Sequence, residues 1–318
     1  SEVKEEFGQW RDLEKIGDEF KLMYDFVCNH TSAKSDWFLE YCKGNKEYED
    51  FFSPSELGGI CTKGLTLNRR EGNKGIRIYE TTGGLLNSIG MQNPGVHDFI
   101  KEDLPLMEKY GTVLIANSGG STIDEYIKSV QIISGTSIPI IELNISCPNV
   151  KEGGMAFGLK AEIAYKVVKE VRNATNKPLI VKLSPNGENI VDIAENCVKA
   201  GADGLSLVNT FSGMAVDIYK RKPVFDNIIA GLSGPCIKPI SLRMVYEVSK
   251  AVDVPIIGIG GIMDYKDGLE YIMAGASLIQ VGSGNFIKPN ISVDIIQRME
   301  MFMNENGIKS IDEIVGII

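Results

Sequence analysis

The middle of the chain carries the segment Ile138-Pro139-Ile140-Ile141-Glu142-Leu143-Asn144-Ile145-Ser146-Cys147-Pro148-Asn149. Its first half, residues 138–143, is an apolar run with the length and composition expected of a buried strand. Its second half opens into a loop in which Asn144 and Asn149 flank the thiol of Cys147. Carboxamides can satisfy the polar edge of a flat heterocycle, and a thiol on a loop can move a proton. The segment therefore predicts a buried strand that leads into a site for redox chemistry on a small planar substrate.

Outward from this strand, short apolar and β-branched segments alternate with longer amphipathic ones. The amphipathic segments 162–173, 190–200, 241–252 and 265–274 predict helices between the strands. Eight strands in this alternating order predict an α/β fold, a (β/α)8 TIM barrel, and a doubly wound open sheet is the alternative. The predicted strands are Lys21–Cys28, Gly58–Thr62, Thr112–Ala116, Ile140–Asn144, Leu179–Leu183, Gly204–Val208, Ile256–Gly258 and Ser277–Val281.

Length and composition agree with one large barrel. A chain of 318 residues, 43% of them hydrophobic, can bury a single core and fits a soluble α/β enzyme. No apolar stretch reaches the roughly 20 residues of a membrane span, and no signal peptide opens the chain. We therefore expect a cytoplasmic protein with no membrane partner. The net charge of −9 argues against nucleic acid as a partner.

The cysteines and histidines restrict the chemistry further. The six cysteines form no CxxC pair and no zinc spacing, so we expect reduced thiols and no metal site. Cys61 and Cys197 are predicted core residues. Only two histidines are present, His30 and His97. This scarcity directs the search for a general base toward cysteine, lysine and carboxylates.

Polar and glycine residues follow most of the predicted strands at the point where each strand ends. In a barrel these carboxyl ends converge on one face, where active sites are built. We therefore expect one site to contain Lys63-Gly64, Asn117, residues 144–149, Lys182, Asn209-Thr210, Gly260-Gly261 and Gly282-Ser283.

The last two predicted strands are followed by the glycine turns Gly258-Ile259-Gly260-Gly261-Ile262 and Gly282-Ser283-Gly284. Backbone N–H groups in such turns can cradle a phosphate, although tight barrel packing also explains many of them. The dinucleotide spacing GxGxxG is absent after these strands, which argues against a Rossmann nicotinamide site. The turns therefore favour the phosphate of a cofactor such as FMN.

Two single residues each have two interpretations. Lys182 lies inside the apolar run 179–183, and a buried ammonium must be paired. It either stabilises a reduced, anionic flavin or forms a salt bridge at the barrel floor. Cys147 is either an inert packing residue or a base acting on a carbon acidified by a carbonyl group.

The amide-rich loop of residues 87–95 lies far in sequence from any predicted strand end. It is either an ordinary turn, built on Asn93-Pro94-Gly95, or a lid that binds substrate. The pattern alone favours neither.

A series of motifs covers about three quarters of the chain: Thr62-Lys63-Gly64, residues 87–95, Ile115-Ala116-Asn117, residues 142–150, residues 181–186, Val208-Asn209-Thr210, Gly231-Leu232-Ser233-Gly234-Pro235 and residues 258–262. From about Ser55 to about Pro289 the chain thereby resembles dihydroorotate dehydrogenases, the FMN enzymes of pyrimidine synthesis. The cysteine of the Ser-Cys-Pro-Asn loop marks the soluble class. Residues 150–154 and 231–235 resemble the catalytic subunit of the NAD-linked subclass.

The resemblance implies a role for each group. Cys147 would take a proton from C5 of dihydroorotate while hydride leaves C6 for flavin N5. Electrons would pass to NAD through a partner subunit that holds FAD and a [2Fe-2S] cluster, in a heterotetramer with a homodimeric core of this chain. The substrate would be held by Lys63, Asn87, Ser88, Ile89, Gly90, Met91, Asn144, Asn209 and Thr210. FMN would be held by Lys63, Gly64, Asn117, Asn144, Lys182, Val208, Gly234, Gly260, Gly261, Gly282 and Ser283.

The first fifty or so residues depart from this family, because its flavin-contacting Ala-Ser-Gly turn and Gly-Phe-Gly segment are absent. Residues 22–32, 35–38 and 45–52 instead resemble a fragment of an α-amylase family glycoside hydrolase. Residues 1–52 also hold 13 acidic against 7 basic side chains. We expect residues 1–54 to form an atypical segment that supplies the first barrel strand. Residues 55–318 would form the FMN-binding barrel, and the junction between the two parts would lie near residues 52–55.

Three hypotheses remain open on these grounds. The first is dihydroorotate oxidation with weakened FMN binding, because Asn29 and His30 replace the small flavin-contacting turn. The second is a catalytically dead chimeric barrel, and the third is the same chemistry on another dihydropyrimidine. Glycosidase activity is not expected, because the later carboxylates that flank a sugar bond are missing.

Overall fold

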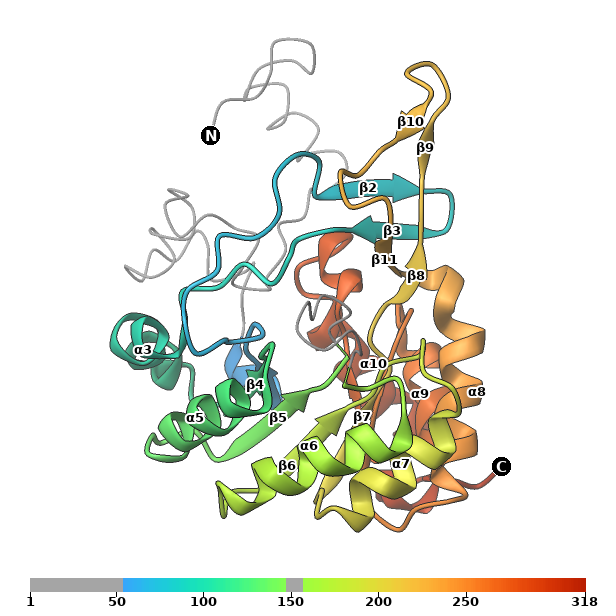
Figure 1. The fold of residues 1–318 in the computed structure, drawn as a ribbon. Helices are drawn as coiled ribbons and strands as arrows, with labels where there is room; N and C mark the ends of the chain where they lie inside the picture. The colour runs from blue at the N-terminus through green and yellow to red at the C-terminus, as the bar shows by residue number, and fades with distance from the viewer. Residues whose placement is uncertain (1–53, 147–156) are drawn as a thin grey trace.

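A computed structural model describes residues 54–146 and 157–318 of the chain. Its main sheet is parallel throughout, and its strands follow one another in space in their chain order (Figure 1). The strands are β1 (Gly59–Cys61), β4 (Val113–Ser118), β5 (Ile140–Asn144), β6 (Leu179–Lys182), β7 (Gly204–Leu207), β12 (Ile256–Ile259) and β13 (Leu278–Gln280).

This strand order confirms the TIM-barrel prediction. A doubly wound sheet reverses its strand order at a switch point, and the seven strands show no reversal, so that alternative is wrong. Each of the seven coincides with a predicted strand to within a few residues. The eighth predicted strand, Lys21–Cys28, and the atypical first β/α unit lie outside the described residues.

Helices lie between successive strands, and α5 to α9 contact one another in sequence around the sheet. They are α5 (Ile123–Ser134), α6 (Ala161–Asn173), α7 (Ile190–Lys199), α8 (Lys238–Ser249), α9 (Tyr265–Met273) and α10 (Ile291–Glu305), with the short α3 (Val96–Asp98) and α4 (Leu104–Met107) after the loop of residues 87–95. Polar N-caps fix several starts: the Asn189 carboxamide caps α7, and Asp264 forms a capping box with Asp267 on α9. Helix α8 begins three residues before its predicted start, because Pro239 is tolerated in a first turn.

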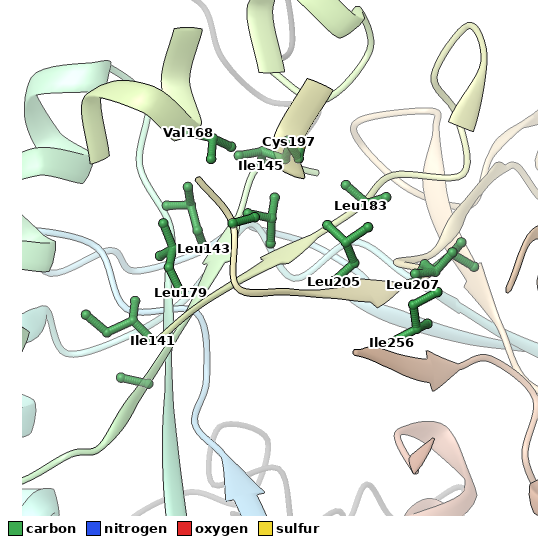
Figure 2. Packing of buried hydrophobic residues seen from close by; sticks show 14 of the residues in the cluster. Ile141, Leu143, Ile145, Val168, Leu179, Leu183, Cys197, Leu205, Leu207 and Ile256 are labelled. Atoms are coloured by element: carbon green, nitrogen blue, oxygen red, sulfur yellow. The ribbon is translucent and has the colours of Figure 1, made fainter. Parts of the chain in front are cut away.

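The core lies between the barrel strands and these helices. Along β5, Ile141 and Leu143 are fully buried in one large apolar cluster that includes Val168 of α6 and Cys197 of α7 (Figure 2). Side chains alternate along a strand, so Glu142, between them, faces the barrel interior. The same alternation on the neighbouring strands decides which polar side chains meet inside the barrel.

A second, antiparallel sheet stands over the barrel in Figure 1 and was not predicted. Its order is β2-β3-β11-β8, with β2 (Ile78–Thr81), β3 (Gly84–Asn87), β8 (Phe211–Gly213) and β11 (Ala230–Ser233). A two-stranded hairpin, β9 (Val216–Asp217) and β10 (Lys222–Pro223), extends from it. The amide-rich loop was predicted to lie far from any strand end, which is wrong, because β3 ends at Asn87. Within the described ranges, no helix is long and apolar enough to span a membrane.

Candidate active site

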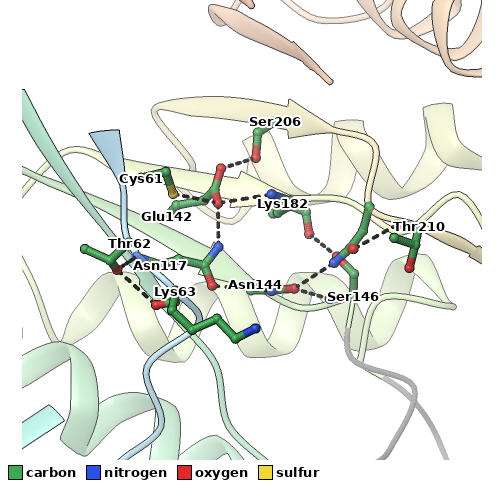
Figure 3. A network of polar contacts seen from close by, with 11 residues as sticks. Cys61, Thr62, Lys63, Asn117, Glu142, Asn144, Ser146, Lys182, Ser206 and Thr210 are labelled. Carbon is green, nitrogen blue, oxygen red and sulfur yellow. Dashed lines mark hydrogen bonds and ion pairs between the residues drawn. The ribbon is translucent and has the colours of Figure 1, made fainter. Parts of the chain in front are cut away.

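Inward-facing side chains from five neighbouring strands meet at one place inside the barrel. The register of the parallel pairs sets Asn117 opposite Glu142, Asn144 opposite Lys182, and Lys182 opposite Ser206. Figure 3 shows the resulting group of polar side chains. It consists of Cys61 from β1, Asn117 from β4, Glu142 and Asn144 from β5, Lys182 from β6 and Ser206 from β7.

The Glu142 carboxylate is the centre of this group and is fully buried. Its Oε1 accepts from Asn117 Nδ2 at 2.5 Å and from Cys61 Sγ at 3.3 Å, and its Oε2 accepts from Ser206 Oγ at 2.7 Å. Burial favours the protonated form, but the Lys182 ammonium and these hydrogen bonds outweigh it. The pKa of Glu142 is therefore lowered, and the side chain remains an anion.

Lys182 is paired, as a buried ammonium must be. Its Nζ lies 3.5 Å from Glu142 Oε1. Burial lowers the pKa of Lys182, and the neighbouring Glu142 carboxylate more than restores it, so the net shift is upward. The predicted salt bridge is therefore present, but its predicted place at the barrel floor is wrong, because Lys182 is the last residue of β6 and lies at the carboxyl ends of the strands.

The two predicted core cysteines differ from each other. Cys197 is buried among apolar side chains of the core, and burial raises the pKa of its thiol to about 12. Cys61 instead donates to Glu142, so its assignment as a packing residue was incomplete. Burial and the adjacent carboxylate raise the pKa of Cys61 well above its ordinary value, which keeps the thiol protonated.

A chain of carboxamides leads from this group toward the next strand ends. Asn144 Nδ2 donates to Asn117 Oδ1 at 3.3 Å, and Asn209 Nδ2 donates to Asn144 Oδ1 at 3.4 Å. Backbone N–H groups of Ser146 and Thr210 donate to the Oδ1 atoms of Asn144 and Asn209 at 3.2 and 2.8 Å. Three predicted ligand-binding asparagines and Thr210 are thus brought together, with their amide orientations linked.

The loop of residues 87–91 reaches the same mouth. Asn87 Nδ2 donates to the Gly231 carbonyl at 3.2 Å, which ties the end of β3 to β11. Met91 adopts a positive φ of 54°, and a Cβ at Gly64 would lie 3.6 Å from the Met91 methyl group. The loop therefore lies against the residues that follow β1. This favours the lid interpretation over the ordinary turn. Ser88, Ile89 and Gly90 belong to the same segment, in which Ser88 and Ile89 are buried.

The glycine turn after β12 closely approaches the residues that follow β11. Gly260 and Gly261 have φ values of 134° and 69°, and a Cβ at Gly261 would lie 2.8 Å from the Gly234 carbonyl oxygen. Tyr271 Oη, from α9, donates to the Gly260 carbonyl at 2.7 Å and fixes the turn against that helix. Protein atoms already occupy the space that a side chain would need, so the turn requires glycine. Beside Gly282, after β13, no heavy atom of the described residues lies within 4 Å of where a Cβ would stand, so the backbone there is open to a ligand.

The remaining predicted residues lie at strand ends as expected, with one outside the described ranges. Val208 follows β7 and donates its N–H to the Ile259 carbonyl at 3.0 Å, while Gly282 and Ser283 follow β13. Lys63 and Gly64 follow β1, where Lys63 is drawn beside Thr62 in Figure 3. Cys147, the predicted base, lies outside the described residues, which end at Ser146 on this side of the gap.

Glu142, Ser206 and the polar role of Cys61 were not predicted. A usable indication was present for Glu142, because it interrupts an apolar strand just as Lys182 interrupts the next one. Two opposite charges in adjacent buried strands predict an ion pair. Ser206 and Cys61 gave no comparable indication, since small polar residues are common in cores.

The fold is an α/β barrel, and its buried polar side chains gather at the carboxyl ends of the strands, where enzymes of this fold have their active sites. A sequence model described as dihydroorotate dehydrogenase matches residues 41–303. Because this match covers most of the chain, the protein belongs to the dihydroorotate dehydrogenase family of oxidoreductases.

Relatives cover nearly the same part of the chain. The "Dihydroorotate dehydrogenase B (NAD(+)), catalytic subunit" of Petrotoga mobilis is 64% identical over 273 residues, which are 86% of this chain and 91% of that protein. Proteins of the same description from Alkaliphilus metalliredigens and Geotalea uraniireducens are each 48% identical. These two matches cover 85% and 86% of this chain and 90% of each relative.

The N-terminal segment is also similar to a second family. A sequence model of the alpha amylase catalytic domain matches residues 1–76, which overlap the first match over residues 41–76. The similarity of residues 1–52 to a glycoside hydrolase fragment is thereby confirmed. The junction near residues 52–55 and the two-part division of the chain stay predictions.

Proposed function

We propose that this chain oxidises dihydroorotate to orotate in pyrimidine biosynthesis, as the FMN-dependent catalytic subunit of an NAD-linked enzyme in the cytoplasm. Membership of the family supports the reaction, and the names of the relatives support the NAD-linked type. The observation that carries the proposal is the single mouth where a buried ammonium, linked carboxamides and glycine turns meet.

The residues present fit FMN. The space beside Gly282 is open, because no heavy atom in the part of the chain that the structure describes lies within 4 Å of where a Cβ would stand, which suits a phosphate, and Ser283 after β13 would supply a hydroxyl. Lys182, Asn117 and Asn144 would face the polar edge of the ring, while Lys63, Gly64, Val208, Gly260 and Gly282 would complete the site. Bound FMN supplies a two-electron acceptor for the hydride.

The substrate would lie against the amide chain and the loop of residues 87–91. Dihydroorotate is a small ring with carbonyl and N–H groups, and Asn87, Asn144 and Asn209 each offer a donor and an acceptor. Lys63 would pair with the substrate carboxylate. Ser88, Ile89, Gly90, Met91 and Thr210 would enclose the ring and exclude water.

Cys147 would act as the base that takes the C5 proton. The backbone that leads to it is firmly held at the mouth, because Ser146 Oγ donates to the Lys182 carbonyl at 2.9 Å. The C5–H electron pair would form the new C5=C6 bond as hydride leaves C6, so the substrate loses one proton and one hydride. A partner subunit with FAD and a [2Fe-2S] cluster would carry the electrons to NAD. This partner subunit would bind to a homodimer of this chain.

The first experiment is the visible absorbance spectrum of the purified protein, before and after anaerobic addition of dihydroorotate. We expect flavin bands that bleach with dihydroorotate and persist with dihydrouracil. Replacing the base in Cys147→Ala should keep the bands and slow the bleaching by about 10²- to 10⁴-fold. The exposed Cys236→Ser is the matched control and should bleach at the normal rate.

Each other result has a definite meaning. Bleaching by dihydrouracil alone would transfer the reaction to another dihydropyrimidine. Absence of flavin bands, even after FMN is added, would support the catalytically dead barrel instead. The specific observation behind that second candidate is the amylase-like match of residues 1–76, where the family carries a flavin-contacting turn. FMN titration measures the weakened affinity that this replacement implies, and an affinity typical of flavoenzymes would contradict it.

A further inference from the structure

The Glu142 carboxylate contacts side chains from four other strands, and no role has been assigned to it so far. Two of its partners, Lys182 and Asn117, belong to the residues proposed to hold FMN, at 3.5 and 2.5 Å. The carboxylate itself is fully buried, whereas 17% of the Lys182 side chain is exposed. The ammonium is thus the member of the pair nearer to a ligand.

The contacts leave Glu142 little freedom. A carboxylate can only accept hydrogen bonds, so Asn117 must turn its Nδ2 toward Glu142. Asn117 Oδ1 is then available to accept from Asn144 Nδ2, as observed at 3.3 Å. Ser206 and Cys61 hold the carboxylate from its other sides at 2.7 and 3.3 Å. Removing the negative charge would therefore release Lys182 and weaken the hydrogen bond that fixes Asn117.

Charge balance gives Glu142 a second effect. With both groups ionised, the buried pair has no net charge. A lone ammonium beside a flavin would stabilise the anionic reduced ring, and a lone carboxylate would destabilise it. The sum of the two charges, rather than Lys182 alone, would set the tendency of the flavin to accept electrons.

We propose that Glu142 is a positioning residue that holds Lys182 and Asn117 toward the flavin and, as the counter-ion of Lys182, sets the reduction potential of the bound cofactor. This inference rests on the proposed function and deepens it, since it assigns control of the flavin to a residue that does not touch it.

The test is a double-variant cycle of wild type, Glu142→Gln, Lys182→Met and the double variant, each loaded with FMN. The site charge is zero in the wild type and in the double variant, and positive in Glu142→Gln. In Lys182→Met, burial favours the protonated Glu142, so the charge is negative only where that carboxyl is ionised, and the potentials are therefore compared at neutral and at alkaline pH. We expect the potential to be highest in Glu142→Gln and lowest in Lys182→Met. At a fixed ambient potential the ratio of reduced to oxidised flavin should differ from wild type by at least about tenfold, roughly 30 mV for a two-electron couple.

The double variant protects the test against misfolding, because buried pairs replaced by neutral groups are well tolerated. Its potential should return close to that of wild type. Lys199→Met, which removes the ammonium of the exposed ion pair with Glu195 on α7, is the matched control and should leave the potential unchanged. A residue with a merely structural role would lower FMN affinity without ordering the potentials by charge.

Failure of this inference can be told apart from failure of the proposed function. A wild-type protein that takes up no FMN overturns the proposed function, and this inference with it. A second outcome is that the wild type takes up FMN, and its reduction potential differs from that of the double variant as widely as the two single variants differ from each other. That result overturns only the role of Glu142. Equal potentials in all four proteins would do the same.

Discussion

The barrel sheet and the antiparallel sheet above it contribute to the same mouth by different means. Strands β4 to β7 are buried on both sides, and their inward side chains are fixed by an ion pair and short hydrogen bonds around Glu142. The antiparallel sheet rests on a small apolar cluster of Leu86, Phe225 and Ala230, and much of β2 is exposed. The charged side chains around Glu142 therefore lie in the part of the protein where moving the backbone costs the most free energy. The loop of residues 87–91 is attached to the antiparallel sheet, where moving the backbone costs less free energy.

The largest expected effect that sharpens this comparison is a cavity in the barrel layer. Leu143→Ala should lower the free energy of unfolding by about 2–5 kcal/mol, because Leu143 is fully buried in the main cluster. The loss should be global, so that urea unfolding followed by fluorescence and by circular dichroism gives coincident transitions. Transitions that separate between the two probes would contradict a single cooperative barrel.

A smaller effect concerns the dependence of stability on pH. The pKa of Glu142 is lowered in the folded protein, so its stabilising contribution is present above the unfolded value of about 4.3 and is lost as pH falls through the folded value. The pKa of Lys182 is raised, so its contribution is lost only as pH rises through the folded value, above about 10.4. The pair should thus stabilise the barrel fully across the neutral range.

Unfolding by urea between pH 3 and pH 7 measures this contribution. Wild type should lose more stability on acidification than the Glu142→Gln, Lys182→Met double variant, which has no pair to titrate. Parallel loss in the two proteins would mean that the pair contributes nothing to acid sensitivity.

The same contrast explains how much the sequence could predict. Barrel strands are continuous apolar runs followed by polar residues, so β5 and β6 are evident from residues 138–144 and 179–183. Strands β3 and β11 are four residues long, contain glycine and are only partly buried, so they lack a clear period-2 pattern. Their existence depends on pairing between residues 144 positions apart, as in the bond from Asn87 to Gly231.

Within the site, the sequence predicted which residues lie there better than it predicted which of them contact one another. The resemblance gave Lys182, Asn117 and Asn144 as ligands, and the structure brings all three together. It gave no partner for Lys182, because that partner is chosen by the register of β5 against β6, and register is set by the whole sheet. The placement of Cys61 beside Glu142 depends on β1, β4 and β5 together.

The smallest global effect, and the sharpest test of the comparison, is Leu86→Ala in the antiparallel sheet. Leu86 is as apolar and almost as buried as Leu143, with 2% of its surface exposed, but it packs in the small cluster. If that sheet opens separately from the barrel, Leu86→Ala should lower the free energy of global unfolding by less than about half as much as Leu143→Ala does. The local effect should be larger: amide hydrogen exchange should speed up in β3 and β11 and remain unchanged in β5 and β6.

Leu143→Ala is the matched control for this last experiment, since both variants remove the same atoms. More frequent opening of β3, which the faster exchange reports, should also weaken substrate binding. The reason is that β3 ends at Asn87, which the proposed function places against the substrate. Equal global losses in the two variants, with exchange accelerated throughout, would show that the two sheets unfold as one unit. The loop of residues 87–91 would then be as rigidly held as the network around Glu142, and its proposed role as a lid would lose its physical basis.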